Sequence, residues 1–118
     1  MARPLVLHYA GCQTCKKALA WLARRGVDAE PRPIVDAPPT AAELARWIPA
    51  SGLPVRRWLN TSGLSYRALG KAKIDAMSDP QITARLTQDG KLVRRPVLVL
   101  GDRVLVGFDE QAYAKLFG

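Results

Sequence analysis

The chain has 118 residues, of which 48% are hydrophobic and 24% charged, a balance typical of one globular domain and not of a disordered segment. No apolar run approaches the roughly 20 residues that a membrane helix needs, and the first residues lack a signal-peptide pattern, so we expect a soluble cytoplasmic protein without membrane contact. The net charge of +8 favours an anionic partner, although a basic surface without a dedicated ligand would give the same total.

The N-terminal part of the chain has the pattern strand, helix, strand. An apolar run predicts a buried strand over 5–9, Gly11 breaks it, and a helix is expected over 14–25, ended by Gly26. The next strand candidate, 27–34, contains two prolines, so we expect it at the edge of a sheet.

A helical block follows. Thr40 and Glu43 form a capping-box pattern that opens a helix to about residue 50. The stretch 51–77 contains three glycines and predicts short helices and turns. A further helix is expected to start at 78–81 and to end near 89–90.

The chain closes with a hairpin and a helix. Strands are predicted over 97–100 and 103–106, joined by a Gly-Asp turn, and Asp109 caps a last helix. The order of elements is that of a thioredoxin-like fold. We therefore predict an α/β protein with a single domain over 1–118: a four-stranded mixed sheet with flanking helices and a helical subdomain inserted at about 40–90.

The two cysteines, Cys12 and Cys15, lie where the first strand turns into the first helix. Two thiols and the single histidine, His8, are too few for a structural zinc site, so we expect no metal. A structural disulfide would close a very small loop in a reducing compartment. A reversible redox pair remains, and two small buried residues that pack the helix on the sheet are the alternative.

The helix N-terminus assigns a role to each cysteine. Unpaired amide groups and the helix dipole stabilise a thiolate at Cys12, which would be the nucleophile, and Cys15 on the same helical face would be the resolving thiol. In thioredoxin-like folds the proline before the third strand, here Pro96, is cis and faces the cysteine loop. Arg95 beside it would then point towards the same pocket.

Four motifs carry a resemblance to a known family. They are Cys12-Gln13-Thr14-Cys15-Lys16-Lys17-Ala18 with Trp21-Leu22, Leu59-Asn60-Thr61-Ser62-Gly63 with Tyr66-Arg67, Val93-Arg94-Arg95-Pro96-Val97-Leu98-Val99, and Val106-Gly107-Phe108. In this order, over nearly the whole chain, they resemble the arsenate reductase-related, Spx-like branch of the glutaredoxin superfamily. The resemblance implies the thioredoxin-like fold with an inserted helical subdomain.

The arsenate reductases of this family are similar to the chain in the nucleophile at Cys12 and in oxyanion-binding arginines. One arginine falls on Arg95 and another on Arg56, or on Arg57 if the register shifts by one residue. The third falls on Val106, which carries no charge. These enzymes usually lack a second cysteine three residues after the first and take electrons from glutathione and glutaredoxin instead.

The Spx regulators of the family carry a Cys-x-x-Cys switch and bind the α subunit of RNA polymerase. They generally lack the stretch 60–63, which resembles a less characterised, reductase-like subgroup. Asn60 and its neighbours are either a plain turn or part of an anion nest near the thiol.

From these features we expect a thiol–disulfide oxidoreductase that acts as a monomer on a small anionic or disulfide substrate. It would hold no cofactor and take electrons from glutathione, glutaredoxin or thioredoxin. The alternatives are an Spx-like redox-sensing regulator that binds RNA polymerase and a genuine arsenate reductase. The expected site residues are the catalytic Cys12 and Cys15 and the substrate-binding Arg95, Arg56, Pro96 and Asn60.

Overall fold

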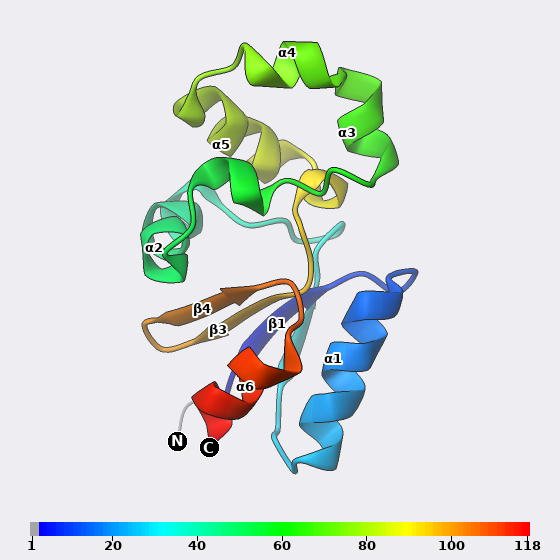
Figure 1. Cartoon of the computed structure of the whole chain (residues 1–118), viewed down its shortest axis with the longest axis vertical. Helices are drawn as coiled ribbons and strands as arrows, with labels where there is room; N and C mark the ends of the chain where they lie inside the picture. Colours follow the sequence, from blue (N-terminus) through cyan, green and yellow to red (C-terminus); the bar gives the residue numbers. More distant parts are fainter. Residues whose placement is uncertain (1–2) are drawn as a thin grey trace.

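A mixed four-stranded sheet of order β2–β1–β3–β4 forms the centre of the computed structural model, which describes residues 3–118 (Figure 1). β1 runs parallel to β2 and antiparallel to β3, and β3 runs antiparallel to β4. This topology confirms the predicted thioredoxin-like sheet. The strands are β1 (Leu5–His8), β2 (Glu30–Pro33), β3 (Val97–Leu100) and β4 (Arg103–Val106).

β2 lies at the edge of the sheet, as its prolines predicted, but it is shorter than the expected range 27–34. Glu30 and Ile34 each donate an N–H to a carbonyl in or next to β1 at 2.8 Å. Pro31 and Pro33 alternate with these donors, so the nitrogens that lack a hydrogen face the open edge. The strand begins only at Glu30 because that residue pairs with the first residue of β1.

One face of the sheet is covered by α1 (Gln13–Arg24) and α6 (Glu110–Phe117). Val6 of β1 and Leu98 of β3 point to this side and form a buried cluster with Trp21 and Tyr113. Adjacent residues of a strand point to opposite faces, so Leu7 and its neighbours belong to the second, larger cluster on the other side. The first helix is therefore anchored along its length, which fixes the position of its N-terminus.

The segment between β2 and β3 is a chain of helices that packs on the second face and extends beyond the sheet (Figure 1). Two of its helices begin with capping boxes. The sequence predicted the box of Thr40 with Glu43, whereas for Ser78 with Gln81 it predicted only the start of a helix. Within residues 3–118 no helix has both the length and the apolar composition needed to cross a membrane. The elements are α2 (Ala41–Ser51), the 3₁₀ helix η1 (Val55–Trp58), α3 (Leu64–Leu69), α4 (Lys71–Asp75), α5 (Asp79–Gln88) and the 3₁₀ helix η2 (Gly90–Leu92).

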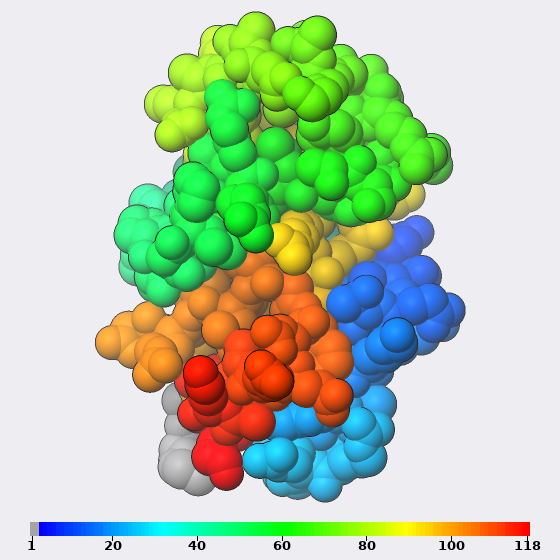
Figure 2. Space-filling model, in the orientation of Figure 1, coloured from blue at the N-terminus to red at the C-terminus, as the bar shows by residue number. Residues whose placement is uncertain are grey.

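Segments that are far apart in the sequence lie side by side at the surface. Figure 2 shows the segment that follows η2 (yellow) reaching the surface between the helical insertion (green) and the loop before α1 (blue). This junction contains the residues around the dithiol.

Candidate functional site

Cys12 lies at the N-terminus of α1 in the position of a helix N-cap. Its backbone is extended, and its Sγ accepts a hydrogen bond from the N–H of Cys15 at 3.2 Å. The N–H of Cys12 donates to the carbonyl of Tyr9 at 3.0 Å, which fixes the loop before the helix. No acidic residue lies in the first turn. The half-buried sulfur therefore meets the free amide groups and the positive end of the helix dipole, which stabilise a thiolate.

Cys15 is the inner member of the pair. Its side chain is only 1% exposed, and both cysteines are free thiols. Burial raises the pKa of Cys15 from its ordinary value of 9.0 to about 12; the adjacent Cys12 thiol acts in the same direction, and the positive charge of Arg95 opposes the shift. At neutral pH Cys15 is thus a protonated thiol that reagents reach poorly, beside the more accessible Cys12.

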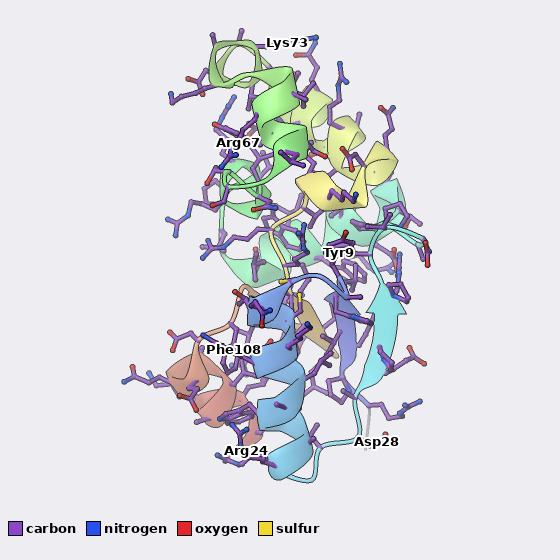
Figure 3. All side chains as sticks on the ribbon, turned by 90° about the vertical axis from the view of Figure 1, so that its right-hand side faces the viewer. Tyr9, Arg24, Asp28, Arg67, Lys73 and Phe108 are labelled. Atoms are coloured by element: carbon purple, nitrogen blue, oxygen red, sulfur yellow. The ribbon has the colours of Figure 1, made fainter. Side chains whose placement is uncertain are left out.

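The ring of Tyr9 connects the cysteine loop to two cations. Cζ of Arg95 lies 4.8 Å from the ring centroid and Nζ of Lys91 lies 5.6 Å from it, within the range of cation–π contacts. Figure 3 shows Tyr9 where β1 meets the helical insertion. Gly11 leaves room for the ring, because a Cβ at that position would come within 2.9 Å of Cε2 of Tyr9.

Arg95 approaches the dithiol from the loop before β3. Its peptide bond to Pro96 is cis, as expected from the fold. Nη1 of Arg95 donates to the Lys91 carbonyl at 3.2 Å, whereas its Nε is buried without a hydrogen-bond partner among residues 3–118. The structure thus brings Cys12, Cys15 and Arg95 together and leaves the buried Nε donor of the guanidinium unpaired among residues 3–118.

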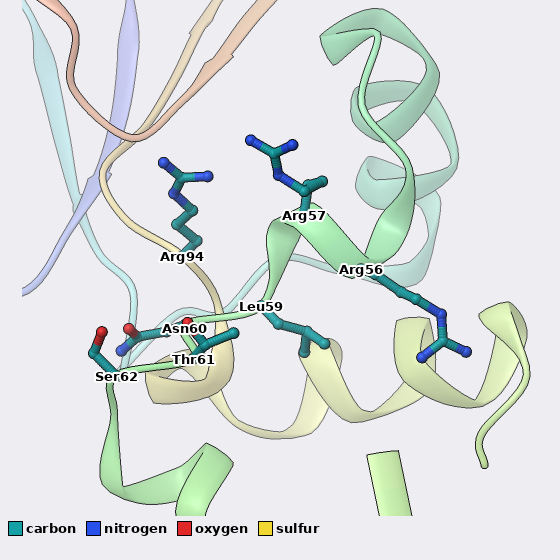
Figure 4. Close-up of a pocket in the computed structure, with 7 residues that line it drawn as sticks. All are labelled: Arg56, Arg57, Leu59, Asn60, Thr61, Ser62 and Arg94. Atoms are coloured by element: carbon teal, nitrogen blue, oxygen red, sulfur yellow. The ribbon is translucent and has the colours of Figure 1, made fainter. Parts of the chain in front are cut away.

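Arg56 is not part of this group. Its guanidinium donates to the carbonyls of Ile74 at 3.2 Å and of Met77 at 2.6 Å, at the C-terminal end of α4. In Figure 4 it points away from Arg57 and Arg94, which extend in a common direction. Of the two registers considered from the sequence, the geometry favours Arg57 as the arginine that is free to contact a ligand.

Asn60 is linked to the arginine side of the site through a shared carbonyl. Its Nδ2 donates to the Lys91 oxygen at 3.4 Å, the same oxygen that accepts from Arg95. Val106, the position of the third family arginine, is the last residue of β4; it pairs with Val97 and packs against the larger core. A valine there offers an oxyanion neither a charge nor a donor.

Two residues of the site, Tyr9 and Lys91, are not singled out by the sequence. An aromatic residue at the end of a strand, two residues before a Gly-Cys pair, is the only local signal for Tyr9. Lys91 contributes a carbonyl oxygen and a cation to partners far away in the chain, and nothing in its own neighbourhood predicts this.

The sheet topology and the Cys-x-x-Cys pair at the start of the first helix define a thioredoxin-like protein. Residues 7–116 match the model of the ArsC family, and the chain belongs to this family.

The named relatives include an uncharacterised protein, an enzyme and a transcriptional regulator. The uncharacterised protein YusI of Bacillus subtilis is 38% identical over 106 residues, which are 89% of this chain and 90% of that protein. An arsenate reductase of Rhizobium meliloti is 29% identical, covering 84% of this chain and 71% of that enzyme. The global transcriptional regulator Spx of Streptococcus agalactiae is 25% identical, covering 84% and 72%.

Solved structures agree with the fold over its full length. An ArsC family related protein from Bacteroides fragilis superposes with a TM-score of 0.92 at 43% identity, covering 98% of both chains. A possible arsenate reductase from Streptococcus mutans gives 0.87 at 35% identity and covers all of both chains.

Proposed function

We propose that the protein is a cytoplasmic thiol–disulfide oxidoreductase in which Cys12 is the nucleophile and Cys15 the resolving thiol. The observation that carries this proposal is the hydrogen bond from the Cys15 N–H to the Cys12 Sγ at 3.2 Å. It puts the accessible sulfur at the end of the helix where a thiolate is stabilised, next to a buried thiol.

The proposed cycle has two exchange steps. The Cys12 thiolate attacks one sulfur of a disulfide; the S–S bond breaks, the released thiolate takes a proton from water, and a mixed disulfide joins Cys12 to the substrate. Cys15 then loses its proton to solvent, and its thiolate attacks the Cys12 sulfur. This step releases the second substrate thiol and leaves a Cys12–Cys15 disulfide. Two electrons, supplied by two glutathione molecules or by one thioredoxin-type dithiol, reduce this disulfide and restore the starting state.

Arg95 supports the second step and contacts the substrate. Its positive charge lowers the pKa of Cys15 and so favours the thiolate that the step requires. Besides the Nη1 bond to the Lys91 carbonyl, its guanidinium carries further N–H groups that can donate to an anionic group bound at the dithiol. Pro96 forms part of the same loop, and Asn60 acts on Arg95 through the Lys91 carbonyl to which both donate.

Reduction of hydroxyethyl disulfide, coupled to NADPH through glutathione or through thioredoxin, tests the proposal. We expect Cys12→Ser to abolish turnover. With no external thiol present, Cys15→Ser should stop after one equivalent of mixed disulfide, detected by mass spectrometry. Arg95→Ala should slow resolution, and Arg95→Lys should restore part of the rate. Ala20→Ser, on the exposed side of the same helix, is the matched control and should be neutral. Unchanged turnover in Cys15→Ser with both donors would refute the resolving role.

The second candidate function is that of an Spx-like redox-sensing regulator that binds RNA polymerase. It is supported by the 25% identity to a protein named as a global transcriptional regulator and by the same dithiol read as a switch. Pull-down of purified RNA polymerase by the reduced and the oxidised protein tests it. Redox-dependent retention together with negligible disulfide turnover would favour this function over the enzyme.

A further inference from the structure

A groove runs between α1 and the segment at which α6 begins. Its volume is about 370 Å³. Figure 2 shows the two segments, α1 in blue and the start of α6 in orange-red, meeting at the surface. Three of the six lining side chains are cations, one is aromatic and one is acidic. The lining residues are Lys16, Lys17, Ala20, Arg24, Phe108 and Glu110.

The groove begins next to the dithiol. Lys16 lies in the first turn of α1, and its N–H donates to the Cys12 carbonyl at 3.1 Å. From there the groove follows an exposed side of the helix to Arg24, its last residue. Eight residues of α-helix span about 12 Å, so a cationic surface of that length leads away from the accessible sulfur. A peptide attached to this sulfur through a disulfide would have its next residues within reach of the groove.

The positive charge of the groove is not neutralised within the protein. Among residues 3–118, Lys16, Lys17 and Arg24 form no ion pair. Glu110, the single acid of the lining, is the first residue of α6, where the positive end of the helix dipole stabilises its charge. Three cations against one carboxylate leave a net positive surface. Such a surface favours an acidic partner over a basic one.

The core fixes both walls of the groove. The half-buried Phe108 ring meets the buried Tyr113 ring edge to face, with centroids 4.8 Å apart, and the buried Trp21 anchors α1 from below. Ala20 is exposed, and its small side chain leaves the hollow between the walls open. Figure 3 shows Phe108 beside α1 and Arg24 further along the same helix. The groove thus offers an apolar ring within a cationic surface.

We propose that this groove docks an acidic segment of the protein that exchanges disulfides with Cys12. The proposal rests on the oxidoreductase function and adds the charge and the size of the partner. Lys16 and Arg24 lie about 12 Å apart along the helix, too far for a single carboxylate or phosphate group to contact both. A segment with several carboxylates can contact both and place an apolar side chain on Phe108. A small disulfide reaches the sulfur without filling the groove.

Two peptides that differ only in charge test the proposal. Each carries one cysteine joined to 2-thiopyridine, so that attack of the Cys12 thiolate on the peptide sulfur breaks the S–S bond and releases pyridinethione, which is followed by absorbance. One peptide has glutamate at the second, fourth and sixth residues after its cysteine, about 7, 13 and 20 Å away in an extended chain. The other has glutamine there. We expect the glutamate peptide to react roughly tenfold faster at about 50 mM NaCl and to lose most of this advantage at about 500 mM.

The ratio of the two rates is compared among variants, because it cancels any effect of a substitution on the Cys12 thiolate itself. Lys17→Gln and Arg24→Gln should each lower the ratio about two- to fivefold, the effect of one exposed charge pair. Glu110→Gln should raise it, since this change removes the acid of the groove. Arg46→Gln and Lys115→Gln remove exposed cations outside the groove and should leave the ratio unchanged.

Equal rates for the two peptides with the unmodified protein would overturn the proposal. An equal loss in the Arg46 and Lys115 variants would also overturn it, because the preference would then belong to the net charge of +8 and not to the groove. Absence of pyridinethione release from both peptides would contradict the oxidoreductase function instead. Fluorescence anisotropy of the same peptides with serine in place of cysteine then decides the docking alone: preferential binding of the glutamate peptide, weakened by Arg24→Gln and not by Arg46→Gln, supports it, and equal binding of both peptides refutes it.

Discussion

The burial of Cys15 predicts an unusually unreactive thiol. In Cys12→Ser, Cys15 is the only cysteine, and its exchange with dithiodipyridine at pH 8 reports its thiolate. With Cys12 present, a pKa of about 12 in place of 9.0 lowers the thiolate fraction about 1,000-fold. The serine variant lacks the Cys12 thiol, which contributes to this rise, so 1,000-fold is the upper bound for it. A more basic thiolate is also more nucleophilic. With a Brønsted slope near 0.45, this raises the rate constant of the thiolate about 20-fold. Ionisation alone is therefore expected to lower the rate by up to about 50-fold relative to the unfolded chain. The 1% exposure of the side chain slows access further.

The assay follows pyridinethione absorbance under pseudo-first-order conditions. The same variant unfolded in urea supplies the reference rate at ordinary pKa, and Cys15→Ser gives the rate of Cys12 in the folded protein. The folded Cys12→Ser rate should rise tenfold per pH unit up to at least pH 10, because the thiol is far below its pKa throughout. A folded rate within about threefold of the unfolded one would refute the assignment of Cys15 as a buried, protonated thiol.

Three further outcomes follow from the structure. Arg56→Ala should lower the free energy of unfolding in urea by about 1–2 kcal/mol, through loss of two hydrogen bonds to carbonyls near the end of α4, with the reactivity of Cys12 unchanged. The Arg32 guanidinium, bonded to Glu43 at 2.7 Å, holds the pKa of that carboxyl below 4.5. The ion pair therefore stabilises the fold fully above that pH. Its contribution is lost as the pH falls through the pKa of Glu43 in the folded protein. Between pH 6 and 3 the free energy of unfolding should therefore change less with pH in Glu43→Gln than in the unmodified protein. Arsenate reduction, assayed with glutathione and with thioredoxin, should be at least tenfold slower than disulfide reduction, since Val106 supplies no third cation; efficient turnover at micromolar arsenate would contradict this.

Elements that depend on local chemistry could be predicted from the sequence. The capping box of Thr40 and Glu43 and the Gly-Asp turn between β3 and β4 satisfy their hydrogen bonds within a few residues, and both occur where the sequence placed them. The start of β2 depends on pairing with a strand about 25 residues earlier, and the predicted range 27–34 was three residues too long at its N-terminus. The prolines indicated an edge but carried no information on register.

At the dithiol, too, the local features could be predicted from the sequence and the long-range contacts could not. The Cys-x-x-Cys spacing at a strand-to-helix turn is a local signal, and it predicted that Cys12 would lie at the helix N-terminus. The surroundings that distinguish the two sulfurs are not local: Arg95 and Lys91 reach the Tyr9 ring from more than 80 residues away. The expected fold, through the proline before its third strand, and the resemblance to a family pointed to Arg95, whereas the cysteine spacing did not.

The adjacent arginines of η1 show why neighbouring residues of one type take different roles. Successive side chains of a 3₁₀ helix diverge by about 120°, so Arg56 and Arg57 cannot face the same surroundings. The carbonyls of Ile74 and Met77, 18 and 21 residues further along the chain, accept hydrogen bonds from Arg56 and not from Arg57. Arg56 meets them and stabilises the end of α4, where a helix favours a cation. Arg57 lines the same cleft as Arg94 and forms no ion pair within residues 3–118. Which of the two neighbouring arginines keeps its guanidinium unpaired therefore depends on contacts with a distant part of the chain, and the local sequence does not predict it.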